Sequence, residues 1–265
     1  MEIVIDYGFS LIDLEYFLLI LTRITCFIYI APFFGMNNTP GRVKIGLGFF
    51  ISVLVYYLLT PKQYPDYSGV FGYSMLVAKE AATGLIIGLG AQICLSITNF
   101  AGRMVDMEIG LAMVNQLDPT TKENSTISGI YYQYFTMILL IITGMYHYLI
   151  RALVESFQLI PVSGAIFRYE NLLENMLSFL RDYLVIGFKI CLPVFATIML
   201  LNVVLGILAK VAPQMNMFAV GMQLKIIVGL TILFISCSLL PMGVDMIFEE
   251  MKVVIVSFVK SIMPQ

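Results

Sequence analysis

Charged side chains that interrupt long apolar runs are the first candidates for chemistry, and we single out five of them. They are Arg23, Lys79, Glu80, Lys189 and Lys225. A charge in a membrane-crossing segment is costly unless it is paired or reaches water, so it is a functional candidate by default. We interpret Arg23, Glu80, Lys189 and Lys225 as intramembrane charges that form ion pairs between helices or between subunits. A proton relay would need carboxylates or histidine deep in the membrane, whereas the deep charges here are mostly basic.

Residues suited to catalysis or metal binding are scarce. His147 is the only histidine, and the four cysteines are Cys26, Cys94, Cys191 and Cys237. No nucleophile has a plausible base nearby, and the sequence contains no CxxC, HExxH or phosphate-binding loop. We therefore predict no enzymatic activity, no catalytic residue, no metal site and no cofactor.

The elements that carry the buried charges are long apolar runs. A membrane-crossing helix needs about 20 apolar residues, because the hydrocarbon core is about 30 Å thick and the helix rises 1.5 Å per residue. Such segments must satisfy their own backbone hydrogen bonds, so we predict an all-α, polytopic fold of membrane-type helical hairpins. Pro193 should kink the fifth run. The runs are residues 16–34, 43–59, 70–100, 127–150, 176–211 and 217–247, and an amphipathic stretch at 246–262 follows.

The composition indicates a membrane protein. The chain has 265 residues, of which 60% are apolar and 12% charged, with a net charge of −2. A soluble domain carries about 25% charged residues, and a disordered chain needs low hydrophobicity, so both classes are disfavoured. The slightly negative net charge also disfavours a nucleic-acid-binding protein, which would need a basic surface. Basic residues are spread evenly between successive loops, which leaves the orientation open and fits a protein whose placement is set by partner subunits.

Residues 101–125 form the most informative segment. It is polar and interrupted by glycine, yet it keeps an apolar stripe. Irregular backbone between long apolar helices is tolerated where it is buried in protein or lines a water-filled path. We therefore predict a re-entrant or plug-like element here. Arg103 and Asp106 are spaced i, i+3 and can pair on a helix face.

Two stretches of this sequence resemble a known family. One is Gly110-Leu-Ala-Met-Val-Asn-Gln-Leu-Asp118-Pro119, and the other is the Pro-Gln-Met-Asn-Met-Phe segment that starts at Pro213, followed by Gly221 and Lys225. Together they resemble FliR, the flagellar export-gate family, whose injectisome counterpart is SctT. Supporting positions follow in the expected order over nearly the whole chain, among them Arg23, Glu80, Gly84, Gly88 and His147.

The resemblance implies an organisation and a set of partners. Residues 1–265 would be one integral membrane domain, with a FliP-like part at 1–175 and a FliQ-like helical hairpin at 176–265. The implied partners are FliP-like and FliQ-like subunits, FlhB-like and FlhA-like export components, unfolded secreted substrates and the membrane. The implied location is the bacterial inner membrane, within the flagellar basal body. The implied hairpin turn contains Pro213, Gln214, Asn216 and Phe218.

The resemblance also implies a function, that of a pore and gate subunit of the flagellar type III protein export apparatus. A loop of this subunit would help to plug the channel through which unfolded flagellar subunits are secreted. Flexible residues and soft methionine contacts suit a plug that closes the pore and then yields to a chain. The positions that match the plug are Asp106, Met107, Gly110, Leu111, Ala112, Met113, Asn115, Asp118 and Pro119.

Two other functions remain open at this point. An SctT-type export-gate subunit of a virulence injectisome would share the same pattern. A secondary transporter would need a midplane site at the interface of two repeats, and the sequence has no paired broken helices in symmetric halves.

Overall fold

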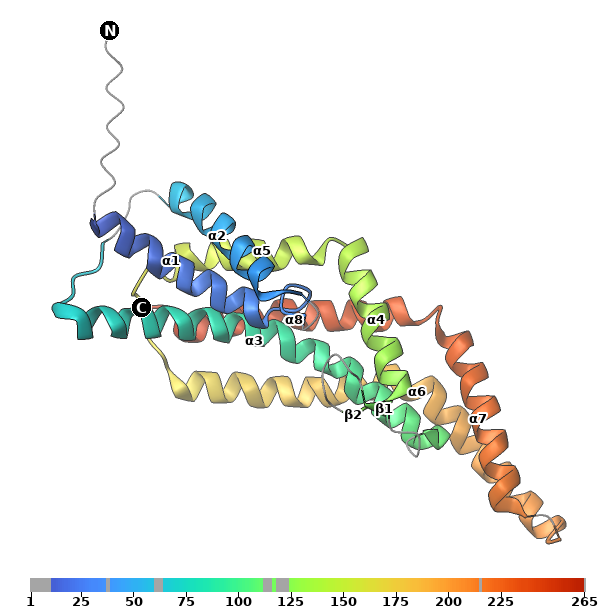
Figure 1. Ribbon diagram of the computed structural model, residues 1–265. Coiled ribbons are helices and arrows are strands. Elements are labelled where there is room, and N and C mark those ends of the chain that lie inside the picture. Colours follow the sequence, from blue (N-terminus) through green and yellow to red (C-terminus); the bar gives the residue numbers. More distant parts are fainter. Residues whose placement is uncertain are drawn as a thin grey trace. The chain divides into compact units, whose positions relative to one another are not determined.

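Helices dominate the computed structural model, which describes residues 11–36, 39–59, 64–111, 116–117, 124–214 and 216–264. The two-residue strands β1 (Gln116–Leu117) and β2 (Asn124–Ser125) pair antiparallel between α3 and α4. The predicted all-α, polytopic fold class is confirmed. In chain order the helices of Figure 1 are α1 (Leu11–Ile30), α2 (Gly41–Leu58), α3 (Gly69–Ile109), α4 (Ile127–Ile142), α5 (Met145–Leu159), α6 (Tyr169–Val211), α7 (Met217–Ser236) and α8 (Leu240–Ile262).

Four of the described helices are long and apolar enough to cross a membrane. They are α2, α3, α6 and residues Ala219–Ser236 of α7, and the bent pair α4 and α5 adds a fifth if it is counted as one span. In α6, only 22% of the most apolar window is buried within the chain. Since a soluble protein rarely exposes so large an apolar surface, lipid or partner subunits must cover the rest.

Two of the predicted helices were wrong in extent, because each contains a break. The run at 127–150 divides into α4 and α5, which meet at an angle of 71°. Gly144 allows this bend, since its φ of 71° lies in the left-handed region that glycine tolerates. The run at 217–247 ends at Ser236, and α8 starts at Leu240. Hydropathy stays high through both breaks, so an apolar run does not reveal them.

Two other helices extend beyond their predicted runs. Helix α3 continues from the predicted end at residue 100 to Ile109, which gives it 41 residues. Helix α6 begins at Tyr169 and has 43 residues, with Pro193 inside it. Proline removes one helical hydrogen bond and crowds the preceding turn, and α6 accordingly changes direction at Pro193 without ending there.

The chain folds into two compact units that interleave along the sequence. Unit 1 comprises residues 1–92, 147–175 and 254–265, and unit 2 comprises residues 93–146 and 176–253. Helices α3, α6 and α8 each contribute residues to both units. A unit boundary falls between Asn175 and Met176, although the division into FliP-like and FliQ-like parts at this point stays a prediction.

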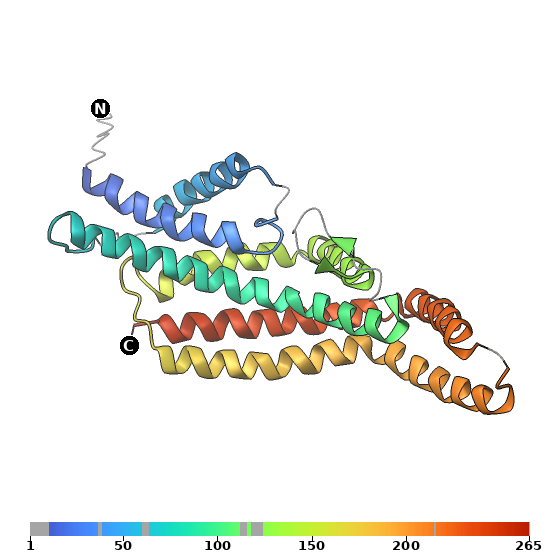
Figure 2. The same cartoon turned by 60° about the horizontal axis from the view of Figure 1, so that its bottom comes forward.

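Unit 1 is built around α1, which lies beside α2 (Figure 2). The rings of Phe17 and Phe49 meet edge to face with centroids 5.7 Å apart. A Cβ on Gly48 would come within 2.8 Å of the Thr25 side chain, so the absence of a side chain lets α2 approach α1 closely. Leu19, Ile20, Ile24 and Phe27 of α1 are fully buried.

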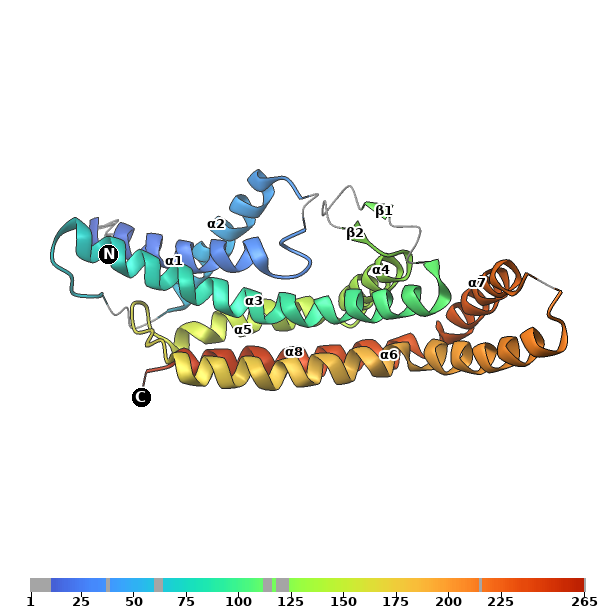
Figure 3. The ribbon, with the colours of Figure 1, turned by 90° about the horizontal axis from the view of Figure 1, so that it is seen from below.

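Unit 2 has a core drawn from five helices and carries the α6–α7 hairpin, in which α7 returns beside the end of α6 (Figure 3). In α3 the core residues recur every four positions, so one helical stripe faces inward. The core cluster contains Ala101, Val105 and Ile109 of α3, Tyr132 of α4, Cys191, Val194 and Ile198 of α6, Leu233 of α7 and Leu240 of α8.

Candidate functional site

Arg23 of α1 and Glu80 of α3 form an ion pair in the interior of unit 1. The guanidinium donates from Nε to Glu80 Oε2 at 2.5 Å and from Nη2 to Oε1 at 3.0 Å. Both side chains are 0% exposed. A two-point geometry of this kind fixes orientation as well as charge. The pair therefore joins two helices whose sequence positions lie 57 residues apart.

The remaining polar atoms of this pair are also satisfied. Arg23 Nη1 donates to the carbonyl of Ile160 at 2.9 Å, and Nη2 donates to that of Pro161 at 3.5 Å. Glu80 Oε1 accepts from the backbone N–H of Ser163 at 2.7 Å. A buried ion pair is tolerated only when such extra hydrogen bonds replace the lost water. The pair thus also holds the chain that follows α5.

Glycines in α3 create the space for this arrangement. A Cβ on Gly84 would lie 2.1 Å from the backbone oxygen of Arg23, and one on Gly88 would lie 3.0 Å from that of Phe27. Glycines four residues apart occupy one helix face, and small residues there let two backbones approach closely. Gly84 and Gly88 therefore set the spacing of α1 and α3 at which Arg23 reaches Glu80.

Asp106, near the end of α3, binds the start of α4 inside unit 2. The carboxylate is 1% exposed and accepts from the Ser128 backbone N–H at 3.1 Å and from its hydroxyl at 2.5 Å. Helices begin with unsatisfied N–H groups, and a carboxylate placed there also favours the helix dipole. The possible pairing of Asp106 with Arg103 was wrong, because the carboxylate turns inward to Ser128 while Arg103 is exposed.

Two further contacts fix the same junction. The Thr126 hydroxyl oxygen caps α4 by accepting from the Gly129 N–H at 3.3 Å. A Cβ on Gly102 would lie 2.2 Å from the Gly129 Cα, so α3 and α4 cross with their backbones in contact. The two helix ends that flank residues 111–125 are therefore both anchored in the core of unit 2.

The described part of the predicted plug starts at the end of α3. Gly110 has a φ of 91°, and its N–H donates to the Asp106 carbonyl at 3.0 Å, which closes the last helical turn. Met107 is 59% exposed, whereas Leu111 packs against the core of unit 2. Ala112, Met113, Asn115, Asp118 and Pro119 lie outside the residues that the structure describes.

The predicted hairpin-turn residues lie between α6 and α7. Pro213 and Gln214 form the turn after α6, and the Asn216 side chain caps α7 by accepting from the Ala219 N–H at 3.4 Å. Phe218 belongs to the first turn of α7, and its side chain is outside the described part. Asparagine is a strong N-cap residue, which explains why the second helix begins at residue 217.

The other two predicted charges lie on the helices of unit 2. Lys189 of α6 is exposed and Lys225 of α7 is partly buried. Neither joins the ion pairs found among the described residues, which are Arg23–Glu80, Arg151–Glu155, Arg181–Asp182 and Lys252–Glu249. Lys189 instead lines a cavity with Pro193.

Sequence reasoning missed the polar groups that complete both buried sites. They are Ile160, Pro161 and Ser163 around Arg23 and Glu80, and Thr126 and Ser128 at Asp106. The first three act through their backbone, so their side-chain types carry no signal. Thr126 and Ser128 directly precede an apolar run, which is a helix-start signal and could have located the start of α4.

The arrangement can hold helices together. No three His, Cys, Asp or Glu side chains there could hold a metal ion together, and the four cysteines are free thiols. What the two sites share is a buried carboxylate that binds the backbone of another segment. Such contacts stabilise junctions between helices.

Comparison with known proteins identifies relatives along almost the entire chain. Residues 14–251 match the family described as bacterial export proteins, family 1. The flagellar biosynthetic protein FliR of Bacillus subtilis is 31% identical over 91% of this chain and 93% of its own length. The FliR proteins of Aquifex aeolicus and Escherichia coli are 30% and 25% identical, over 90% and 87% of this chain and 92% and 87% of their own lengths.

Proposed function

The chain belongs to the FliR family of bacterial export proteins, and from that premise we propose that it is a pore and gate subunit of the flagellar type III export apparatus. In this role it helps to form and plug the channel through which unfolded flagellar subunits are secreted. Its partners are FliP-like, FliQ-like, FlhB-like and FlhA-like components in the bacterial inner membrane, within the basal body. Relatives named as flagellar proteins favour this role over that of an SctT-type injectisome subunit.

The observation that carries the gating proposal is the anchoring of residues 111–125 at both ends. Asp106 and Gly110 hold the end of α3, and Ser128 and Thr126 hold the start of α4. A plug needs fixed ends, because a segment tethered at two points can be displaced by a passing chain and can then return. The residues that anchor these two ends lie in a buried core, where hydrogen bonds are strong and costly to leave unmade.

The uncovered apolar surface supports assembly with partner subunits. The α6–α7 hairpin exposes large side chains along both helices, including Leu200 (69%), Val203 (62%), Ile227 (63%) and Phe234 (83%). Subunits around a channel cover such faces, and an arrangement of this kind also explains why the basic loops favour neither side of the membrane.

Substitution of Gly110 tests the plug. Aspartate and asparagine have nearly the same shape and both tolerate a positive φ better than other side chains, so Gly110→Asp and Gly110→Asn differ in charge alone. A Cβ at this position meets nothing within 4 Å, so neither variant clashes with described atoms. We expect Gly110→Asp to raise ion leakage through the assembled gate in liposomes well above that of Gly110→Asn. Normal leakage in both variants, with assembly intact, would refute the plug assignment.

Purification tests the broader role. The full-length protein should leave the membrane in a complex with the proposed partner subunits, as measured by native mass spectrometry. A monomer that moves a small solute in liposomes would instead identify a transporter.

A further inference from the structure

The end of α3 packs into a notch in α7, inside unit 2. A Cβ on Gly229 would lie 2.5, 2.7 and 2.9 Å from three side-chain atoms of Ile109, and Ile109 is 0% exposed. Ile226, Gly229 and Leu233 are spaced i, i+3 and i+7, so they share one face of α7. Leu233 belongs to the core cluster of unit 2, and Ile226 packs against that cluster. Ile109 therefore fills a space that exists because residue 229 has no side chain.

The last turn of α3 is held on two sides by contacts of different kinds. On the α4 side, Asp106 binds Ser128 through buried hydrogen bonds, which are costly to leave unmade. On the α7 side, Ile109 makes an apolar contact. The hydroxyl groups of α7, on Thr231 and Ser236, donate to carbonyls of the same helix. The contact with α7 can therefore separate and form again without leaving a buried polar group unpaired.

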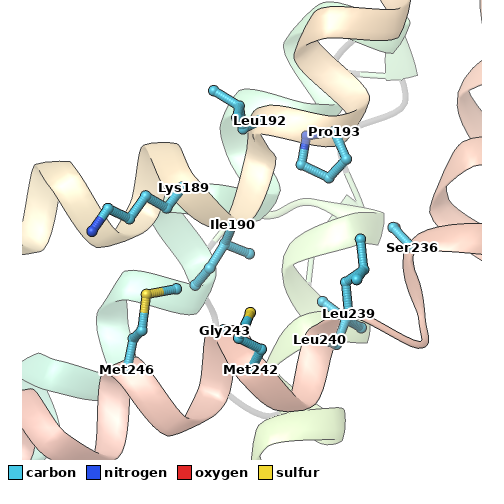
Figure 4. Close-up of a pocket in the computed structure, with 10 residues that line it drawn as sticks. All are labelled: Lys189, Ile190, Leu192, Pro193, Ser236, Leu239, Leu240, Met242, Gly243 and Met246. Atoms are coloured by element: carbon cyan, nitrogen blue, oxygen red, sulfur yellow. The ribbon is translucent and has the colours of Figure 1, made fainter.

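The base of the α6–α7 hairpin contains two bends. Helix α6 changes direction at Pro193, and residues 237–239 separate α7 from α8. Pro193 lies on one side of a cavity, and Ser236 and Leu239 lie on the other (Figure 4). Proline removes a helical hydrogen bond, and hinges are a few residues at element ends that absorb changes in backbone angle. The base of the hairpin can therefore bend without forcing packed side chains into one another.

The hairpin beyond this base is largely exposed. Ile207 and Val211 of α6 are 61% and 75% exposed, and Ile227 of α7 is 63% exposed. Apolar surface of this extent is typical of a protein interaction site, and the assembly proposed above would cover it. A partner that binds these faces can shift the hairpin, and the contact between Gly229 and Ile109 is where such a shift reaches α3.

We propose, on the basis of the gating role above, that the α6–α7 hairpin is a lever that turns about this base, and that Ile109 couples the lever to the gate. While Ile109 is seated against Gly229, the end of α3 stays in the core and the gate is closed. When α7 withdraws, the last turn of α3 loses its support on that side and the gate opens. Ile109 and Gly229 are positioning residues, since they act through the segment that follows α3.

A pair of glycine substitutions in α7 tests the contact. Gly229→Ala drives a methyl group into Ile109, whereas a Cβ on Gly221 would meet Leu205 at an ordinary 3.5 Å. Both variants gain the same helix propensity, so Gly221→Ala is the matched control. We expect ion leakage through the assembled gate in liposomes to be at least about fivefold higher for Gly229→Ala, the factor that corresponds to about 1 kcal/mol of overpacking. Equal leakage in the two variants, with assembly intact, overturns the proposal.

A reversible cross-link gives a readout that a loss of stability would not produce. Ile109→Cys with Gly229→Cys is introduced into the full-length chain in cells, and secretion of filament subunits is measured with diamide and then with dithiothreitol. Diamide takes up the two thiol hydrogens as the disulfide forms. We expect secretion to stop in the oxidised state and to resume on reduction. Ile109→Cys alone, treated in the same way, controls for the four native thiols.

Each other outcome of the cross-link decides against the lever or passes the decision to the glycine pair. Secretion that continues while mass spectrometry detects the disulfide overturns the proposal. Failure of the disulfide to form also overturns it, because the two positions would then not be in contact. If the double variant secretes in neither state, the two alanine variants decide. Gly110→Asp separates the lever from the gate, because leakage in Gly110→Asp without leakage in Gly229→Ala refutes the lever and leaves the gating role in place.

Discussion

Breaking the Arg23–Glu80 pair should destabilise the protein far more than breaking an exposed pair of the same residue types. In Glu80→Gln, the Arg23 guanidinium stays in an interior where it is 0% exposed and loses its counter-charge. Removing one partner of a buried pair costs about 3–5 kcal/mol. A chain of this size loses roughly 2–4 °C of Tm for each kcal/mol, so we expect a decrease of about 10 °C.

The chain provides its own control. Arg151 and Glu155 also pair, at 2.7 Å, but their side chains are 77% and 51% exposed. An exposed pair of this spacing contributes little to stability, so Glu155→Gln should lower the Tm by no more than about 2 °C. Thermal unfolding of the full-length protein in detergent, followed by circular dichroism, measures both variants.

A double variant identifies the cause. Arg23→Met with Glu80→Met removes both charges, so it should cost less than the sum of the two single changes, with a coupling of at least about 2 kcal/mol. It should not restore the wild-type Tm, because the carbonyls of Ile160 and Pro161 and the N–H of Ser163 lose their partners, at about 1–3 kcal/mol each. Equal Tm shifts for Glu80→Gln and Glu155→Gln, or strict additivity in the double variant, would refute the reasoning.

Three other changes follow from the same structure. Gly84→Ala should lower the Tm strongly, because its Cβ would lie 2.1 Å from a backbone oxygen of α1, whereas Gly46→Ala, whose Cβ meets nothing within 4 Å, should leave the Tm unchanged or raise it slightly. Asp106→Ala should lower the free energy of unfolding by about 1–3 kcal/mol and should speed limited proteolysis between α3 and α4. An unchanged cleavage rate would show that this carboxylate does not anchor residues 111–125. In α8, which is not among the membrane-crossing helices, burial raises the pKa of Glu250 and the nearby Asp182 raises it further. A raised carboxyl pKa means that stability is lost as the pH rises through it, so Glu250→Gln should raise the Tm at pH 8 and should raise it less toward pH 4. An equal gain at both pH values would contradict this.

Much of the architecture could be predicted from the sequence, because membrane-length helices are a local property. Their apolar composition and the backbone requirement for internal hydrogen bonds decide the fold class. The hairpin turn could be predicted equally well, since Pro213 stops a helix and Asn216 starts one. Helix breaks were harder to predict, because the bend at Gly144 interrupts no apolar pattern.

The charges in the apolar runs show the limit of this approach. The sequence indicated that Arg23 and Glu80 require compensation, but it left their partners open. The partner of Arg23 is decided by the approach of α3 to α1 at Gly84 and Gly88, together with carbonyls more than 130 residues away in the chain.

The sequence by itself therefore determined the class of protein, the helical content and which polar residues need a hydrogen-bond or ion-pair partner in an apolar environment. Those properties follow from the free energy of transferring each side chain and each peptide group from water. Only the tertiary structure decided that Arg23 binds Glu80 and that Asp106 binds Ser128 instead of Arg103. Hydrogen bonds and ion pairs act over about 3 Å, so they depend on where the helices cross, and that is set by packing between residues distant in sequence.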